Sequence, residues 1–170
     1  MFRICLKFYL NNAKLKSMIV TFCGHSEIFL FQKDKLITEI LEYLKKLGQT
    51  EPLTFYMGGY GEFDQIALNC AEEYKKTRSD TKIIFITPYL DDKYLKNKLP
   101  LKKCYDEIIY PEIEHVPKKF AIIERNKWMI EKCDFLIAFV KYNSGGAYQT
   151  LEYAKKRKKP FINLYTEIEK

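Results

Sequence analysis

Glycine is concentrated in two short segments of the chain, and these segments carry its clearest chemical signal. They contain five of the seven glycines: Gly58, Gly59, Gly61, Gly145 and Gly146. Glycine adopts positive φ angles readily and lets a ligand approach the backbone closely. The N-terminus of a helix offers N–H groups and the positive end of the helix dipole, which suit a phosphate. Two such turns, each before a predicted helix, indicate a nucleotide-like ligand.

The second glycine segment, SGGAYQT at 144–150, has the composition of a phosphate loop. Its residues are mostly small, it carries no acid, and a predicted helix follows at once. We expect Gly145 and Gly146 to hold a phosphate, with the Ser144 hydroxyl donating to it and Thr150 in the first turn of the helix. The alternative is an ordinary tight turn between a strand and a helix.

The first glycine segment, GGYGEFD at 58–64, does not follow the usual G-x-G-x-x-G dinucleotide pattern. It carries Glu62 and Asp64, where a phosphate loop normally avoids negative charge. A carboxylate accepts hydrogen bonds from a diol, so we expect these two acids to contact ribose hydroxyls or a base edge. The glycines at 58, 59 and 61 would then shape the pocket. Asp64 could also cap the following helix.

Other candidate ligand-binding residues are indicated less strongly by the sequence. Gly24, His25 and Ser26 follow a predicted strand, and His25 could contact the ligand or be a structural hydrogen-bonding group. Arg125 shares a helix face with Trp128 and could supply charge to the ligand or lie at the surface. No Walker, nucleophile-elbow or metal motif is present, so we expect no metal site and no required cofactor.

Strands and helices alternate along the sequence. Strands are predicted at 18–23, 53–57, 82–88, 105–112, 134–140 and 160–165, and helices at 36–47, 66–74, 117–130 and 147–157. Strands that are apolar on both faces and separated by helices predict a mostly parallel sheet covered on two sides. Right-handed crossovers then give an α/β, doubly wound, Rossmann-like three-layer sandwich.

Such a sheet binds ligands beyond the carboxyl ends of its strands, where the strand order reverses. We therefore expect the strand at 18–23 to be central, between those at 53–57 and 134–140. The loops at 24–26, 58–64 and 143–147 should then converge on one cleft.

The chain is predicted to form one domain over residues 18–170, preceded by an N-terminal extension over residues 1–17. The extension alternates weakly and could add an edge strand. Because the β/α pattern begins at Met18, a chain starting there is expected to fold with nearly full stability. The charged segment at 89–103 is predicted to be a loop with about one helical turn.

Composition limits the function classes. Apolar residues make up 47% of the chain, which is typical of a globular protein. No apolar run approaches the roughly 20 residues that span a bilayer, so we expect a cytoplasmic protein without a membrane partner. The net charge of +7, with KKRKK at 155–159, could mark a nucleic-acid surface. We prefer the alternative of a lysine-rich solvated surface that attracts anions.

Several motifs agree in order with those of the small stand-alone SLOG proteins. They are VTFCGHSE, FYMGGYGEFDQIAL, IIFITPYLDD, YDEIIYPEIEHVPKKFAIIERNKWM, CDFLIAFV and SGGAYQTLEYAKK, over about residues 18–165. The chain therefore resembles this Rossmann-like superfamily of bacterial and phage-borne proteins, which is named after Smf/DprA and LOG. The resemblance implies a pocket for a nucleotide or an NAD- or ADP-ribose-derived molecule, used for sensing or sequestration, often in phage conflict systems.

The enzymatic LOG branch carries R-K-x-x-M followed by P-G-G-x-G-T-x-x-E. Arg125 matches the arginine, whereas Ser144 replaces the proline. When the two motifs are aligned at Gly146, Glu152 matches the catalytic glutamate of the enzymes. When they are aligned at Thr150, Tyr153 falls at that position instead. The resemblance thus leaves a nucleoside 5′-monophosphate phosphoribohydrolase, using Arg125 and Glu152, as an alternative to a binding protein without catalysis. A nucleic-acid-binding protein is the third hypothesis, and homo-oligomerisation is left open.

Overall fold

The structure is a computed structural model that describes residues 16–91, 93 and 104–168. Its strands are β1 (Met18–Gly24), β2 (Leu53–Met57), β3 (Lys82–Ile86), β4 (Glu107–Ile109), β5 (Phe135–Phe139) and β6 (Phe161–Asn163). Its helices are α2 (Leu30–Leu47), α3 (Glu62–Thr77), α5 (Ala121–Lys132), α6 (Gly145–Lys156) and α7 (Leu164–Ile168), with a 3-10 turn, η2, at Lys118–Phe120. Within the described residues, no helix is both long and apolar enough to cross a membrane.

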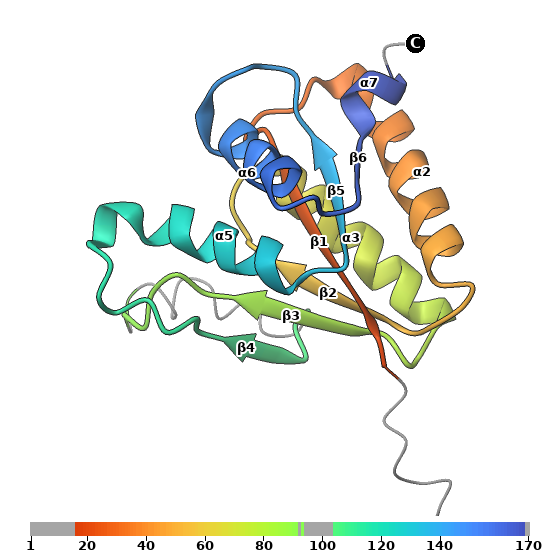
Figure 1. The fold of residues 1–170 in the computed structure, drawn as a ribbon. Helices are drawn as coiled ribbons and strands as arrows, with labels where there is room; N and C mark the ends of the chain where they lie inside the picture. The colour runs from red at the N-terminus through yellow and green to blue at the C-terminus, as the bar shows by residue number, and fades with distance from the viewer. Residues whose placement is uncertain (1–15, 92, 94–103, 169–170) are drawn as a thin grey trace, which may run out of the picture.

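The six strands form one sheet in the order β4-β3-β2-β1-β5-β6, and every neighbouring pair is parallel. Helices cover both faces, with α2, α3 and α7 on one side and α5 and α6 on the other (Figure 1). The prediction of a doubly wound, Rossmann-like sandwich is confirmed, as is the central position of β1. The chain builds outward from β1 to β4 and then returns to place β5 on the other side of β1. The strand order therefore reverses at β1 and β5.

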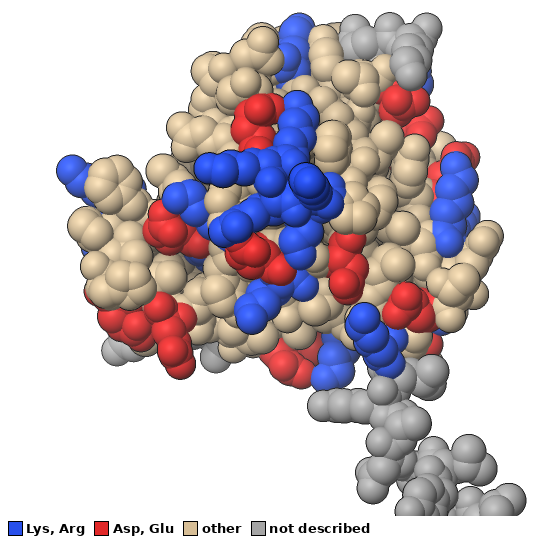
Figure 2. Space-filling view, viewed as in Figure 1, with Lys and Arg blue, Asp and Glu red and all other residues tan. Residues whose placement is uncertain are grey.

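Basic side chains gather on the face covered by α5 and α6. Figure 2 shows lysine and arginine clustered over the C-terminal end of α6, where the KKRKK segment begins in the last helical turn. Cations in this position interact favourably with the negative end of the helix dipole. Lys158, which follows the C-cap residue Arg157, has a φ of 54°, and the chain then continues to β6.

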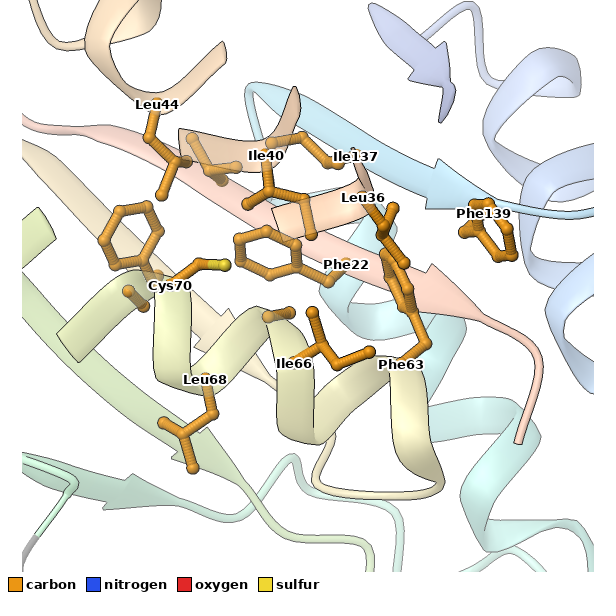
Figure 3. Packing of buried hydrophobic residues seen from close by; sticks show 14 of the residues in the cluster. Phe22, Leu36, Ile40, Leu44, Phe63, Ile66, Leu68, Cys70, Ile137 and Phe139 are labelled. Carbon is orange, nitrogen blue, oxygen red and sulfur yellow. The ribbon is translucent and has the colours of Figure 1, made fainter. Parts of the chain in front are cut away.

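The larger part of the core lies between the sheet and α2 and α3. Leu36, Ile40 and Leu44 recur every four residues on α2, and all three are fully buried. They meet Phe63 and Ile66 of α3 over the central strands (Figure 3). Burying each such side chain contributes roughly 1.5–3 kcal/mol, so this face fixes α3, and with it the loop that precedes α3.

The structure changes some predicted boundaries. The expected strand at 160–165 is shorter, because the chain turns into α7 after Asn163. Leu164 and Ile168 are both buried, and their four-residue spacing lets a helical turn bury both. The helix expected at 147–157 begins two residues earlier, at Gly145. The possible edge strand in the N-terminal extension, and most of the charged segment at 89–103, lie outside the described residues.

Candidate functional site

The loops that follow β1, β2 and β5 line one cleft of about 240 Å³ at the carboxyl edge of the sheet. The predicted site residues from these loops and from the adjoining ends of β1, α3 and α6 that line it are Gly24, His25, Ser26, Gly58, Asp64, Ser144, Gly145, Gly146 and Thr150. Helix α5 adds Arg125, Asn126 and Met129. The cleft lies where the strand order reverses, which is the place where parallel α/β sheets usually bind ligands.

The first turn of α6 forms an open wall of the cleft. Gly145 has a φ of +85°, which favours glycine, whereas Gly146 has no positive φ. A Cβ atom added at either position would find no atom within 4 Å. Ser144 is the N-cap residue, and within the described chain its hydroxyl makes no capping hydrogen bond. The first N–H groups of a helix have no partner inside it, so this wall presents donors and empty space together.

Arg125 is the most deeply buried charged residue in the described part of the chain, with 2% of its surface exposed. Its Nη1 donates to the carbonyl oxygens of Gly58 and Ile86, both at 2.7 Å. The Gly58 carbonyl lies just beyond the end of β2, and the Ile86 carbonyl lies at the end of β3. The guanidinium group therefore ties two strand ends together while it lines the cleft. The sequence analysis predicted that Arg125 could supply charge, but it did not predict that this side chain would link two strand ends.

A chain of hydrogen bonds continues from Arg125 to the first turn of α6. Arg125 Nε donates to Asn126 Oδ1 at 2.9 Å, and Asn126 Nδ2 donates to Thr150 Oγ1 at 3.2 Å. Thr150 in turn donates to the Gly146 carbonyl at 2.8 Å. The two glycine loops are thus joined through α5. Sequence reasoning missed Asn126, and only its place beside Arg125 could have indicated it.

Asp64 lines the cleft as predicted for an acid of the first glycine loop. Its Oδ2 accepts from the backbone N–H of Tyr60 at 2.8 Å. A Cβ on Gly58 would lie 3.0 Å from this oxygen and 3.4 Å from Arg125 Nη1, so the carboxylate and the guanidinium group are close neighbours. Tyr60 also lines the cleft and is 65% exposed, but the sequence analysis did not single it out.

Glu62 is not brought into the cleft, which differs from the expectation that it contacts a sugar. Its Oε2 accepts from the N–H of Ile28 at 2.8 Å, and its Oε1 pairs with Lys33. The hydrogen bonds from Lys33 and then from Ile28 lower the pKa of Glu62. The carboxylate faces away from the cleft because it closes the loop between β1 and α2.

Gly59 and Gly61 do not line the cleft either, and both have a positive φ, of 67° and 88°. A Cβ on Gly61 would lie 2.7 Å from the Cα of Ser26, which is too close for a side chain. The N–H of Glu62 donates to the Ser26 carbonyl at 3.0 Å. Gly61 therefore lets the loops after β1 and β2 pack together, whereas a Cβ on Gly59 would lie 2.8 Å from the ring of Phe85 in β3.

His25 joins the loop after β1 to the loop after β5. Its Nε2 accepts from the backbone N–H groups of Lys141 at 2.7 Å and Tyr142 at 3.2 Å. Burial lowers the pKa of His25, and the charge of Lys141 lowers it further. The neutral ring is required, because a protonated Nε2 cannot accept. His25 thus fixes the position of the loop that leads from β5 to Ser144.

The structure does not bring Glu152 together with Arg125. Glu152 does not line the cleft, and its Oε1 accepts from Lys155 at 2.7 Å. Tyr153, the other residue considered for that position, donates its hydroxyl to Glu131 at 2.6 Å. Both lie along a neighbouring groove between α5 and α6.

No protein-family model matches the chain, and no curated protein matches it. Solved structures of DNA processing protein A (DprA) share its fold. The protein from Helicobacter pylori, which binds single-stranded DNA, is 23% identical with a TM-score of 0.60, over 85% of this chain and 63% of that one. The protein from Streptococcus pneumoniae is 16% identical with a TM-score of 0.61, over 85% of this chain and 49% of that one.

The chain spans less than two thirds of each of these structures. At such identities the likeness shows a shared Rossmann-like fold.

Replacing Arg125 tests the link between the strand ends. We expect Arg125→Met to lower the free energy of unfolding by about 2–4 kcal/mol, because the Gly58 and Ile86 carbonyls lose a charged donor. Arg125→Lys should still cost more than about 1 kcal/mol, since an ammonium group cannot reproduce the planar set of donors. Urea denaturation measures both. Lys45→Arg, on the exposed last turn of α2, is the control and should change stability by less than about 0.5 kcal/mol.

The His25 hydrogen bonds predict a pH-dependent loss of stability. The unfolded histidine binds a proton near its ordinary pKa of 6.5, whereas the folded ring resists protonation. The contribution of His25 is therefore complete above about pH 6.5 and is lost as the pH falls below it. Glu62, whose pKa is lowered from 4.5, titrates below this range.

We expect the melting temperature to fall between about pH 7.5 and pH 5.5, and to fall less in His25→Gln. The glutamine oxygen can accept from the same two N–H groups but does not titrate. An equal fall in both proteins would show that His25 is not the responsible group.

Proposed function

We propose that the protein binds a nucleotide-type ligand, whose phosphate lies on the first turn of α6. The observation that carries this proposal is the glycine at position 146. Alanine in a helix is more stable than glycine by roughly 0.5–1 kcal/mol. Neither the φ of Gly146 nor any atom within 4 Å excludes a Cβ there. The space above it is therefore best explained by a group that approaches the backbone, and helix N–H groups favour an anion.

The other cleft residues suit the rest of a nucleotide. The Ser144 hydroxyl lies beside the proposed phosphate position and can donate to it. Asp64 lines the cleft, and a carboxylate oxygen can accept more than one hydrogen bond, which suits a sugar hydroxyl. Tyr60 offers an exposed ring on which a base could stack. Arg125 adds positive charge from the floor of the cleft.

With the resemblance to small SLOG proteins, these features favour a sensor or sequestering protein for a nucleotide or an NAD- or ADP-ribose-derived molecule. A role in phage conflict follows from that resemblance alone.

Substitutions of Gly146 separate ligand binding from folding. A nucleotide at 100 times its dissociation constant should stabilise the protein by about 2.7 kcal/mol, or roughly 5–10 °C in melting temperature. Gly146→Val should abolish this shift, because its side chain would occupy the phosphate position. Gly146→Ala should raise the melting temperature without ligand and reduce the shift with ligand. A thermal unfolding screen with adenine nucleotides and NAD derivatives measures these effects. The proposal is rejected if no compound shifts the wild-type protein at millimolar concentration.

A phosphoribohydrolase is less well supported, because such an enzyme needs a carboxylate beside the anomeric carbon of the sugar. Glu152 lies outside the cleft and pairs with Lys155. We therefore expect little or no adenine release from adenosine 5′-monophosphate, and no change in Glu152→Ala, as measured by chromatography of the reaction mixture. Turnover that disappears in Glu152→Ala would establish the enzymatic alternative.

Binding of single-stranded nucleic acid is the second candidate function. The observations that favour it are the DNA binding of the Helicobacter pylori protein and the basic cluster at the end of α6. Binding through this surface would weaken steeply with salt, because it would depend on neutralising phosphates. Salt-dependent binding of an oligonucleotide, without any response to nucleotides, would favour this candidate.

A further inference from the structure

A second cavity of about 490 Å³ lies between α5 and α6, directly beside the cleft. The two cavities share Asn126, Gly146 and Thr150 as lining residues. The two cavities meet at Gly146, which has no side chain to separate them. A ligand whose phosphate lies on the first turn of α6 can therefore extend into this α5–α6 groove.

The walls of the α5–α6 groove combine aromatic faces with positive charge. Tyr148 and Tyr153 line it from α6, and the ammonium group of Lys127 lies 5.9 Å from the centre of the Tyr153 ring. The Tyr153 hydroxyl donates to Glu131 and accepts from Arg157 at 3.1 Å. These bonds fix the Tyr153 ring before any ligand arrives, so little ordering entropy would be lost on binding.

Lys156 lies at the far end of the groove, in the last turn of α6. The other charges along this stretch are largely matched: Lys127 pairs with Glu124 and Lys155 with Glu152. Over the described part of the chain, Lys156 is exposed and forms no ion pair or hydrogen bond. The groove thus ends at an unmatched cation, within the KKRKK segment at the C-terminal end of α6.

The length of the groove limits what it can hold. Helix α6 rises about 1.5 Å per residue, so Gly146 and Lys156 are roughly 15 Å apart along the helix. This distance suits one further nucleoside unit or an equivalent ring with an anionic group. Aromatic faces and lysines are the groups that bind a base and a phosphate without reading sequence.

Resting on the proposed function, we infer that the ligand is a two-unit nucleotide, in which two nucleosides are joined through phosphates. One phosphate lies on Gly145 and Gly146, and the second nucleoside lies in the α5–α6 groove against Tyr148 and Tyr153. Lys156, at the far end of the groove, donates to a ring nitrogen of the second base. A mononucleotide fills the cleft alone and leaves the groove empty.

Calorimetric titration of the full chain tests this inference, with adenosine 5′-monophosphate and diadenosine 5′,5′-pyrophosphate as probes. We expect the wild-type protein to bind the two-unit probe at least about tenfold more tightly. Lys156→Glu and Tyr148→Ala should each remove most of this advantage and leave mononucleotide affinity within about twofold. Tyr148→Phe, which keeps the ring, should retain it.

Lys45→Glu is the matched control, because it makes the same charge change in the last turn of α2, outside the groove. It should leave both affinities unchanged. Equal affinity for the two probes would overturn the inference and leave the proposed function intact. Failure of both probes to bind would reject both. If Lys156→Glu instead weakens binding of an oligonucleotide, and the two-unit probe has no advantage, the groove accommodates a polymer and the inference fails.

Discussion

The arrangement of the cleft depends on the buried guanidinium group of Arg125. An unpartnered buried charge would be very costly, so the carbonyls of Gly58 and Ile86 must stay in place to accept from it. The same side chain orients Asn126, which connects to Thr150 on α6. One residue of α5 thereby couples the ends of two strands to the first turn of another helix. The relative position of the two glycine loops is a consequence of this coupling.

This coupling explains why the polar groups of the cleft fall into two kinds. Arg125, Thr150 and the acceptor atom of His25 are already engaged with the protein, and they give the site its shape. Ser144 and the first turn of α6 face open space, and they have the capacity to bind. A preformed wall of this kind binds an anion without reorganising, which is how helix N-termini normally act.

The sequence was a good guide to the elements and a poorer guide to the partners of individual side chains. Apolar runs and helical spacing located β1, β2 and β5, and the parallel arrangement then required their loops to share one edge. The direction of Glu62 could not be predicted in this way, because its partners Ile28 and Lys33 belong to another loop and another helix. The burial of Arg125 has the same cause, since carbonyl acceptors at strand ends carry no sequence signature.

The positions of Asp64 and Glu152 bear on whether the cleft could catalyse a reaction as well as bind a ligand. Hydrolysis of a glycosidic bond needs a carboxylate that can stabilise positive charge or activate water at the anomeric carbon. Among the described residues, Asp64 is the acid that lines the cleft, and it is held by the N–H of Tyr60 next to Arg125. A carboxylate anchored in this way is well suited to orient a sugar hydroxyl. Glu152, the residue that a LOG-type reaction would use, lines the α5–α6 groove and not the cleft.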